Sequence, residues 1–118
     1  MASDMEPKVQ QAYLYDFYGE LLNEHQRKIF EDFVFNDLSL GEIAEEQDIS
    51  RQAVHDLVKR STKKLEEYEN KLHLMARFLE LREKAVSIQQ RATAYEQSHE
   101  EYLLEEIKQI SGEIIKDL

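Results

Sequence analysis

The chain has 118 residues, a formal net charge of −10, one proline, three glycines and no cysteine. This length suits one domain with a modest core, and many helix-forming residues with so few helix breakers predict an all-α protein. The absence of cysteine excludes disulfides, thiolate zinc sites and thiol nucleophiles, and no apolar run approaches the roughly 20 residues that cross a membrane.

Two amphipathic helices are predicted at the start of the chain. Pro7 suits the first turn of a helix, because its missing N–H has no partner there. Asn23 and Gln26 have the three-residue spacing of a capping box, which predicts that the second helix starts there. The apolar faces are formed by Tyr13, Leu14, Phe17, Tyr18, Leu21 and Leu22 in the first helix and by Ile29, Phe30, Phe33 and Val34 in the second.

The stretch SLGEIAEEQDISRQAVHDLVKR has the organisation of two helices around a tight turn. Ser39 is a predicted N-cap with Glu42 as its partner, and Ser50 is the predicted N-cap of the next helix. Between them, Asp48 tolerates the left-handed backbone conformation that a tight turn needs. These signals predict a helix-turn-helix at residues 39–61.

Such a motif needs its own small core. The two helices cross closely only where the first has a small residue, and Ala44 supplies one. Ile43, Ile49, Val54 and Leu57 are expected to face inward around the turn. The remaining side chains of the second helix are then directed outward.

These outward side chains form a candidate nucleic-acid interface. Near the helix N-terminus, the side chains able to donate hydrogen bonds to base edges or phosphates are Ser50, Arg51, Gln52 and His55. Further along, the side chains able to reach phosphates are Lys59, Arg60, Lys63 and Lys64. Residues 51–64 carry five bases and one acid, whereas residues 1–38 carry eight acids and three bases. The chain is therefore acidic with one basic island.

A second interpretation stays open beside this one. Capped helices around a turn occur in many helical proteins, and a basic stretch on a helix is often only a solvated face. The turn also has Asp48 where many such motifs have glycine, and Gln47 where an apolar residue is common. The alternative is a protein-interaction module that keeps the fold and has no DNA binding, and the net negative charge favours it.

The C-terminal half is predicted to be helical throughout. No proline or glycine occurs between Ser50 and Ser111, so one long helix, or two with a bend near Asn70, are expected up to about Ala94. Ser98 and Glu101 have the spacing of a last capping box. The final amphipathic helix has its apolar face at Leu103, Ile107, Ile110 and Ile114. The expected division is a helical domain at residues 1–68 and a C-terminal arm at residues 69–118.

An apolar stripe runs along this arm. Its members are Leu65, Tyr68, Leu72, Met75 and Leu79, widened by Phe78, Leu81 and Val86. The stripe can close on the same chain or on a second copy. Because a single helix-turn-helix buries little area on DNA, most such proteins pair to contact two half-sites. A homodimer through the C-terminal helices is therefore predicted.

Catalysis and metal binding have little support. The four histidines do not have the spacing of zinc-binding helix motifs, and no glycine-rich phosphate loop is present. Glu69 and His73 are four residues apart, which predicts a pair on a helix surface more than shared ligation of a metal. We expect neither an enzyme nor a cofactor. With no cysteine and no secretory signal pattern, a cytoplasmic location is expected.

The segment NEHQRKIFEDFVFNDLSLGEIAEEQDISRQAVHDLVKRSTKKLEEYE resembles region four of bacterial sigma factors. The similarity includes the pair QR, S-x-x-EIAE, IS-x-x-AV and the exit KR…KKL. More closely, the chain is similar to the YlxM-like family of small helix-turn-helix proteins, through YLYDFYGELLNEHQ, DLSLGEIAEEQDISRQAV and LEEYENKLHL. The resemblance is strong from Tyr13 to about Phe78 and weak after it.

The resemblance implies a fold and a role. The fold is an all-α, sigma-region-four-like helix-turn-helix bundle with a long C-terminal helical arm, in which Arg51, Gln52 and His55 contact DNA. The family's implied role is regulatory and linked to the signal recognition particle pathway through gene neighbourhood. Because that particle contains RNA, RNA is an alternative target to DNA. No catalytic residue carries over.

Overall fold

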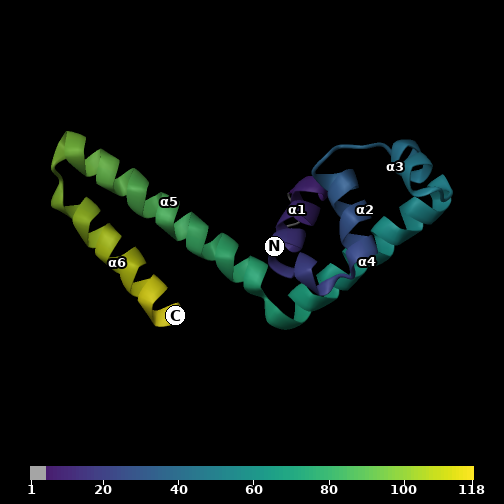
Figure 1. The fold of residues 1–118 in the computed structure, drawn as a ribbon. Coiled ribbons are helices and arrows are strands. Elements are labelled where there is room, and N and C mark those ends of the chain that lie inside the picture. The colour runs from purple at the N-terminus through teal and green to yellow at the C-terminus, as the bar shows by residue number, and fades with distance from the viewer. Residues whose placement is uncertain (1–4) are drawn as a thin grey trace. The chain divides into compact units, whose positions relative to one another are not determined.

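The computed structural model describes residues 5–118, and this part of the chain is all-α, as predicted. Its helices, shown in Figure 1, are α1 (Pro7–Tyr18), the short 3-10 helix η2 (Gly19–Leu21), α2 (Glu24–Val34), α3 (Leu40–Gln47), α4 (Arg51–Leu72), α5 (Leu74–Ser98) and α6 (Glu101–Asp117). None of the helices in residues 5–118 is both long enough and apolar enough to cross a membrane.

The chain divides into two compact units within α5. The first unit ends at Ala76, and the second comprises Arg77–Leu118. The first three residues of α5 therefore belong to the first unit, and the rest of that helix belongs to the second.

The helices of the first unit start where local capping predicts. Asn23 Oδ1 accepts from the Gln26 N–H at 2.8 Å, and Gln26 Oε1 accepts from the Asn23 N–H at 3.1 Å. Ser39 and Glu42 form the same reciprocal pair at the start of α3. The bond from the Ser39 backbone N–H holds the pKa of Glu42 below its ordinary value. Both predicted capping boxes are confirmed.

The core of the first unit is built on one side of α4. This helix packs against α1, α2 and α3, which gather along it in Figure 1. The buried apolar side chains of this unit are Leu14, Tyr18, Leu22, Ile29, Phe30, Ile43, Ala44, Val54, Leu57, Val58, Leu65 and Met75. Because these residues recur every three or four positions on α4, its opposite face is left to solvent.

A buried carboxylate holds the beginning of α5. Glu69 Oε1 accepts from the Tyr18 hydroxyl at 2.5 Å and from the Met75 N–H at 2.9 Å, and Glu69 Oε2 accepts from the Ala76 N–H at 2.9 Å. The Tyr18 oxygen in turn accepts from the Leu74 N–H at 3.1 Å. Burial, and then the bond to the Glu69 carboxylate, raise the pKa of Tyr18. The carboxylate thus satisfies N–H groups that a helix N-terminus leaves without intrahelical partners.

This arrangement corrects the expected surface pair of Glu69 with His73. Glu69 is only 4% exposed and bonds to α1 and α5, whereas His73 ends α4 in a left-handed conformation, with φ of 57°. The helix break thus falls at His73, after the predicted bend near Asn70. The turn also interrupts the predicted apolar stripe, because Leu72 is exposed while Leu65 and Met75 are buried.

The predicted capping box at Ser98 is wrong. Ser98 is the last residue of α5, and its hydroxyl donates to the Ala94 carbonyl at 3.1 Å. His99 reverses the chain in a left-handed conformation, and Glu100 becomes the N-cap of α6 without a side-chain capping bond. Because α5 continues through the serine, the next helix begins later than the capping pattern indicates.

The second unit is an antiparallel pair of helices, α5 and α6 (Figure 1). Ion pairs join them, between Lys84 and Asp117 at 3.0 Å and between Arg91 and Glu106 at 3.0 Å. The hydrogen bond from Lys84 to Asp117 raises the pKa of Lys84. The final amphipathic helix is confirmed, although Leu103 is the one buried residue among residues 77–118.

Replacing Glu69 by alanine is expected to lower the free energy of unfolding by at least about 2 kcal/mol, because it leaves buried hydrogen-bond donors without an acceptor. Urea denaturation followed by circular dichroism measures this change. Glu67→Ala is the matched control, since Glu67 is exposed on the same helix, and it should stay within about 0.5 kcal/mol of wild type. Equal effects of the two substitutions would contradict a structural role for the Glu69 carboxylate.

Candidate nucleic-acid interface

The turn between α3 and α4 has the geometry that its sequence predicts. Asp48 has φ of 56° and ψ of 46°, the left-handed region, and its N–H donates to carbonyls of the last turn of α3. The Ile49 N–H donates to the Ala44 carbonyl at 3.0 Å. Aspartate tolerates this backbone conformation better than most residues, so the turn forms here without glycine. Ser50 Oγ then accepts from the Ala53 N–H at 3.0 Å and caps α4.

The core of the motif confirms the expected packing. Its buried members are Ile29, Ile43, Ala44, Val54, Leu57 and Val58, and partly buried Phe33, Leu38, Leu40 and Ile49 pack against them. Ala44 lets α3 approach α4 closely, because its methyl group takes little space. α2 completes this core by contributing the buried side chain of Ile29. These contacts determine which side of α4 faces outward.

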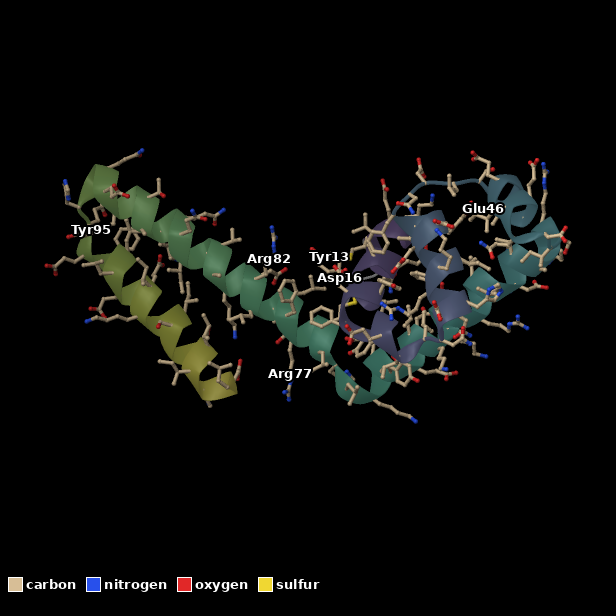
Figure 2. All side chains as sticks on the ribbon, in the orientation of Figure 1. Tyr13, Asp16, Glu46, Arg77, Arg82 and Tyr95 are labelled. Carbon is tan, nitrogen blue, oxygen red and sulfur yellow. The ribbon has the colours of Figure 1, made fainter. Side chains whose placement is uncertain are left out.

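All eight predicted interface residues are exposed. Ser50, Arg51, Gln52 and His55 lie at the N-terminus of α4, and Lys59, Arg60, Lys63 and Lys64 lie further along the same helix. α3 carries exposed acids, Glu45 and Glu46, and Glu46 is labelled on that helix in Figure 2.

The four basic residues do not share one side of α4. Successive residues of an α-helix are rotated by about 100°, so residues four apart stay together while neighbours diverge. Lys59 and Lys63 therefore form one pair, on the side of His55. Arg60 and Lys64 form a second pair on the other flank of the exposed face.

Lys59 and Lys63 border an open groove of about 570 Å³ in the first unit. The apolar side chains of Phe33, Leu40 and Val58 line it. The other lining residues are Gln11, His55, Thr62 and Glu66. The groove therefore places an apolar surface directly beside the basic pair.

Asp56 is a member of this surface that the sequence reasoning did not single out. Gln52 Nε2 donates to Asp56 Oδ1 at 3.0 Å, and His55 Nδ1 lies 3.6 Å from the same oxygen. The side chain of Asp56 is half exposed. The spacing of four residues between Gln52 and Asp56 was the available signal, because such pairs meet on a helix surface.

Gly41 is the second residue that the sequence reasoning did not connect to the interface. A Cβ atom at Gly41 would lie 2.9 Å from Arg51 Nη2 and 3.0 Å from Arg51 Nε. The Arg51 guanidinium thus lies against the first turn of α3. Only a glycine leaves room for the guanidinium in this position.

Within residues 5–118 no group of three or more His, Cys, Asp or Glu side chains is arranged to hold a metal ion.

A family model described as "Putative helix-turn-helix protein, YlxM / p13 like" (UPF0122) matches residues 5–109. The chain belongs to this family. Curated relatives from Bacillus thuringiensis (strain Al Hakam), Bacillus mycoides (strain KBAB4) and Bacillus cereus (strain AH187) carry the name UPF0122 protein. Each is 44% identical over 112 residues, which cover 95% of this chain and 97% of the relative. The predicted resemblance to YlxM-like proteins is confirmed.

Replacing Gly41 by alanine tests the contact with Arg51. Alanine is the better helix former, so the free energy of unfolding should rise, by at most the roughly 0.5–1 kcal/mol of a helix-interior position because Gly41 lies in the first turn of α3. The new methyl group should displace the guanidinium, which is the flexible end of its side chain. Urea denaturation measures the first effect, and a crystal structure of the variant shows the second. A loss of stability would mean that Arg51 cannot move away.

Proposed function

We propose that this UPF0122 protein is a nucleic-acid-binding regulatory protein that reads DNA with the N-terminal half of α4. One observation carries the proposal: hydrogen-bonding side chains are exposed on the first turns of α4, while Val54 and Leu57 anchor the same turns in the core. A recognition helix of a helix-turn-helix has this division between its two sides. Membership of a helix-turn-helix family supports the same function.

The side chains divide into two roles. Arg51, Gln52 and His55 contact base edges in the major groove, where arginine and glutamine can read guanine and adenine. Ser50, at the helix N-terminus, contacts a phosphate. The contacts that position the protein on the backbone come from Lys59, Arg60, Lys63 and Lys64.

The net charge of −10 is compatible with this function. The Debye length is about 8 Å at physiological salt, so exposed acids further away than this are largely screened from a phosphate at α4. The exposed acids nearest to the start of α4 in the chain are Glu45, Glu46, Asp48 and Asp56, all within the motif.

The resemblance to the YlxM-like family suggests a place for this activity. It links the family to the signal recognition particle pathway, which operates in the cytoplasm, and it makes the RNA of that particle an alternative target to DNA. The helix geometry supports DNA first, because an α-helix enters the DNA major groove, whereas the major groove of A-form RNA is too narrow for side chains to read.

A protein-interaction module is the second candidate. The groove favours it, because Phe33, Leu40 and Val58 line an open apolar surface beside the exposed His55 and Lys59. An apolar side chain of a protein partner would bury that surface. The two candidates differ in whether the chain binds nucleic acid at low salt.

We also propose that two copies associate through the C-terminal helices. Among residues 77–118 only Leu103 is buried, which is little core for a helical pair of this length. Besides its inward residues, α6 carries Leu104 and Ile115 exposed on one flank, and Leu118, which directly follows the helix, is exposed as well. Ile115 is 70% exposed. A second copy that covers this flank would remove apolar surface from water, and the resulting dimer would contain two copies of α4, one for each half-site.

The role of the basic residues is tested with paired substitutions. We expect Lys59→Gln with Lys63→Gln, and separately Arg60→Gln with Lys64→Gln, each to lower the salt slope of binding by about 2, because each substituted side chain no longer neutralises a phosphate. Fluorescence anisotropy against mixed duplex DNA and against signal recognition particle RNA, at low and moderate salt, gives these slopes.

The matched control is Lys108→Gln with Lys116→Gln, which changes the net charge equally on α6. Its slope should stay at the wild-type value. An equal decrease of the salt slope in the control would mean that the effect comes from net charge alone. If the wild type binds neither nucleic acid at low salt, the protein-interaction module replaces this proposal.

Association is tested with Ile115→Glu, which places a charge on the exposed flank of α6. Wild type should sediment as a dimer at micromolar concentration, and the variant as a monomer with unchanged helicity. Gln109→Glu adds the same charge at an exposed position on the same helix and should remain dimeric. A wild-type monomer at that concentration would refute the proposed association.

A further inference from the structure

Gln52 and Asp56 are hydrogen-bonded on the exposed face of α4. The two side chains are four residues apart on the exposed face of α4, and Gln52 Nε2 donates to Asp56 Oδ1 at 3.0 Å. His55 Nδ1 lies 3.6 Å from the same carboxylate oxygen. One acid thus touches two of the side chains proposed to read bases.

The chemistry of the pair allows only one orientation of the amide. A side-chain amide has donors on its nitrogen and acceptors on its oxygen, whereas an ionised carboxylate only accepts. Gln52 must therefore turn its nitrogen toward Asp56. Its oxygen, Oε1, is left to accept from a ligand, and only the second N–H of Nε2 is left to donate.

We infer that Asp56 is a positioning residue that sets the base preference of Gln52. This inference rests on the proposed function. In the major groove, adenine and cytosine present an exocyclic amino group, which donates, whereas guanine and thymine present carbonyl oxygens, which accept. An amide held with its oxygen toward the groove selects adenine or cytosine. The Asp56 carboxylate adds to this selection, because it too accepts from cytosine and repels a carbonyl oxygen.

Without the carboxylate, the Gln52 amide rotates freely. It can then donate its N–H groups to O6 and N7 of guanine, or accept from an amino group. Discrimination at this base pair would fall while the rest of the interface is unchanged. This effect differs from the removal of one negative charge, which strengthens binding to every sequence alike.

The test uses the full chain and a library of randomised duplex DNA. Bound sequences are selected and read for wild type, Gln52→Ala, Asp56→Ala and Glu67→Ala. The base pair read by Gln52 is the position at which Gln52→Ala abolishes the preference. Anisotropy with the four possible base pairs at that position then gives the discrimination ratio.

For wild type we expect adenine or cytosine to be preferred over guanine at that position by about 5- to 150-fold, the range for one good base contact. In Asp56→Ala this ratio should fall to below about 2-fold, with preferences at other positions retained. Glu67→Ala removes the same charge from an exposed position of α4 and should keep the wild-type ratio. Asp56→Asn, whose amide can donate or accept, should lower the ratio as well.

Several outcomes would overturn the inference. A wild-type preference that Asp56→Ala retains would overturn it alone and leave the proposed function standing. A wild-type preference for guanine or thymine at the Gln52 position would do the same. Failure of wild type to select any duplex would overturn the proposed function and, with it, the role of Asp56. Far-ultraviolet circular dichroism verifies that each variant keeps its helices.

Discussion

Burial of one apolar stripe of α4 is the interaction on which the rest of the first unit depends. α1, α2 and α3 all pack against this stripe, and through it they hold one another. A fully buried valine or leucine contributes about 1.5–3 kcal/mol, so a few of these residues carry much of the stability of so small a unit. The same burial decides which side of α4 faces solvent. The side chains of the candidate nucleic-acid interface all lie on that exposed side.

The stripe ends in a polar contact that serves the fold in another way. Glu69 lies on the buried side of α4, where a carboxylate without hydrogen-bond partners would destabilise the fold. The Tyr18 hydroxyl and the first N–H groups of α5 supply them. The carboxylate thereby joins three helices, α1, α4 and the beginning of α5, at the end of the first unit. An apolar residue would pack in this position but would leave the N–H groups of α5 without an acceptor.

The electrostatics of the candidate interface follow from local arrangement more than from the sum of charges. The basic residues of α4 are divided between two flanks, and acids of α3 and α4 lie among or beside them. Such a surface would attract a polyanion weakly, so the affinity proposed for nucleic acid would come from short-range contacts. Because short-range contacts depend on direction, we propose that Asp56 acts by orienting a single amide on α4.

The sequence alone determined most elements whose causes are local; the capping pattern at Ser98 is the exception, because α5 continues through that residue. The caps at Asn23, Ser39 and Ser50 and the left-handed turn at Asp48 depend on residues at most four positions away. The side of α4 that is buried follows from its apolar period. These signals were sufficient for the fold class, the helix-turn-helix and the exposure of all eight interface residues. The contact of Gln52 with Asp56 is equally local and was within reach of the same reasoning.

Only the tertiary structure decided the features that depend on distant partners. Glu69 can be buried because the hydroxyl of Tyr18, 51 residues earlier in the chain, donates a hydrogen bond to its carboxylate. The break at His73 becomes evident only once the next helix is seen bonded to that carboxylate. The position of the Arg51 guanidinium depends on how closely α3 approaches α4 at Gly41. A period or a capping pattern shows which residues can take part in such contacts, but the packing of separate helices determines which of them meet.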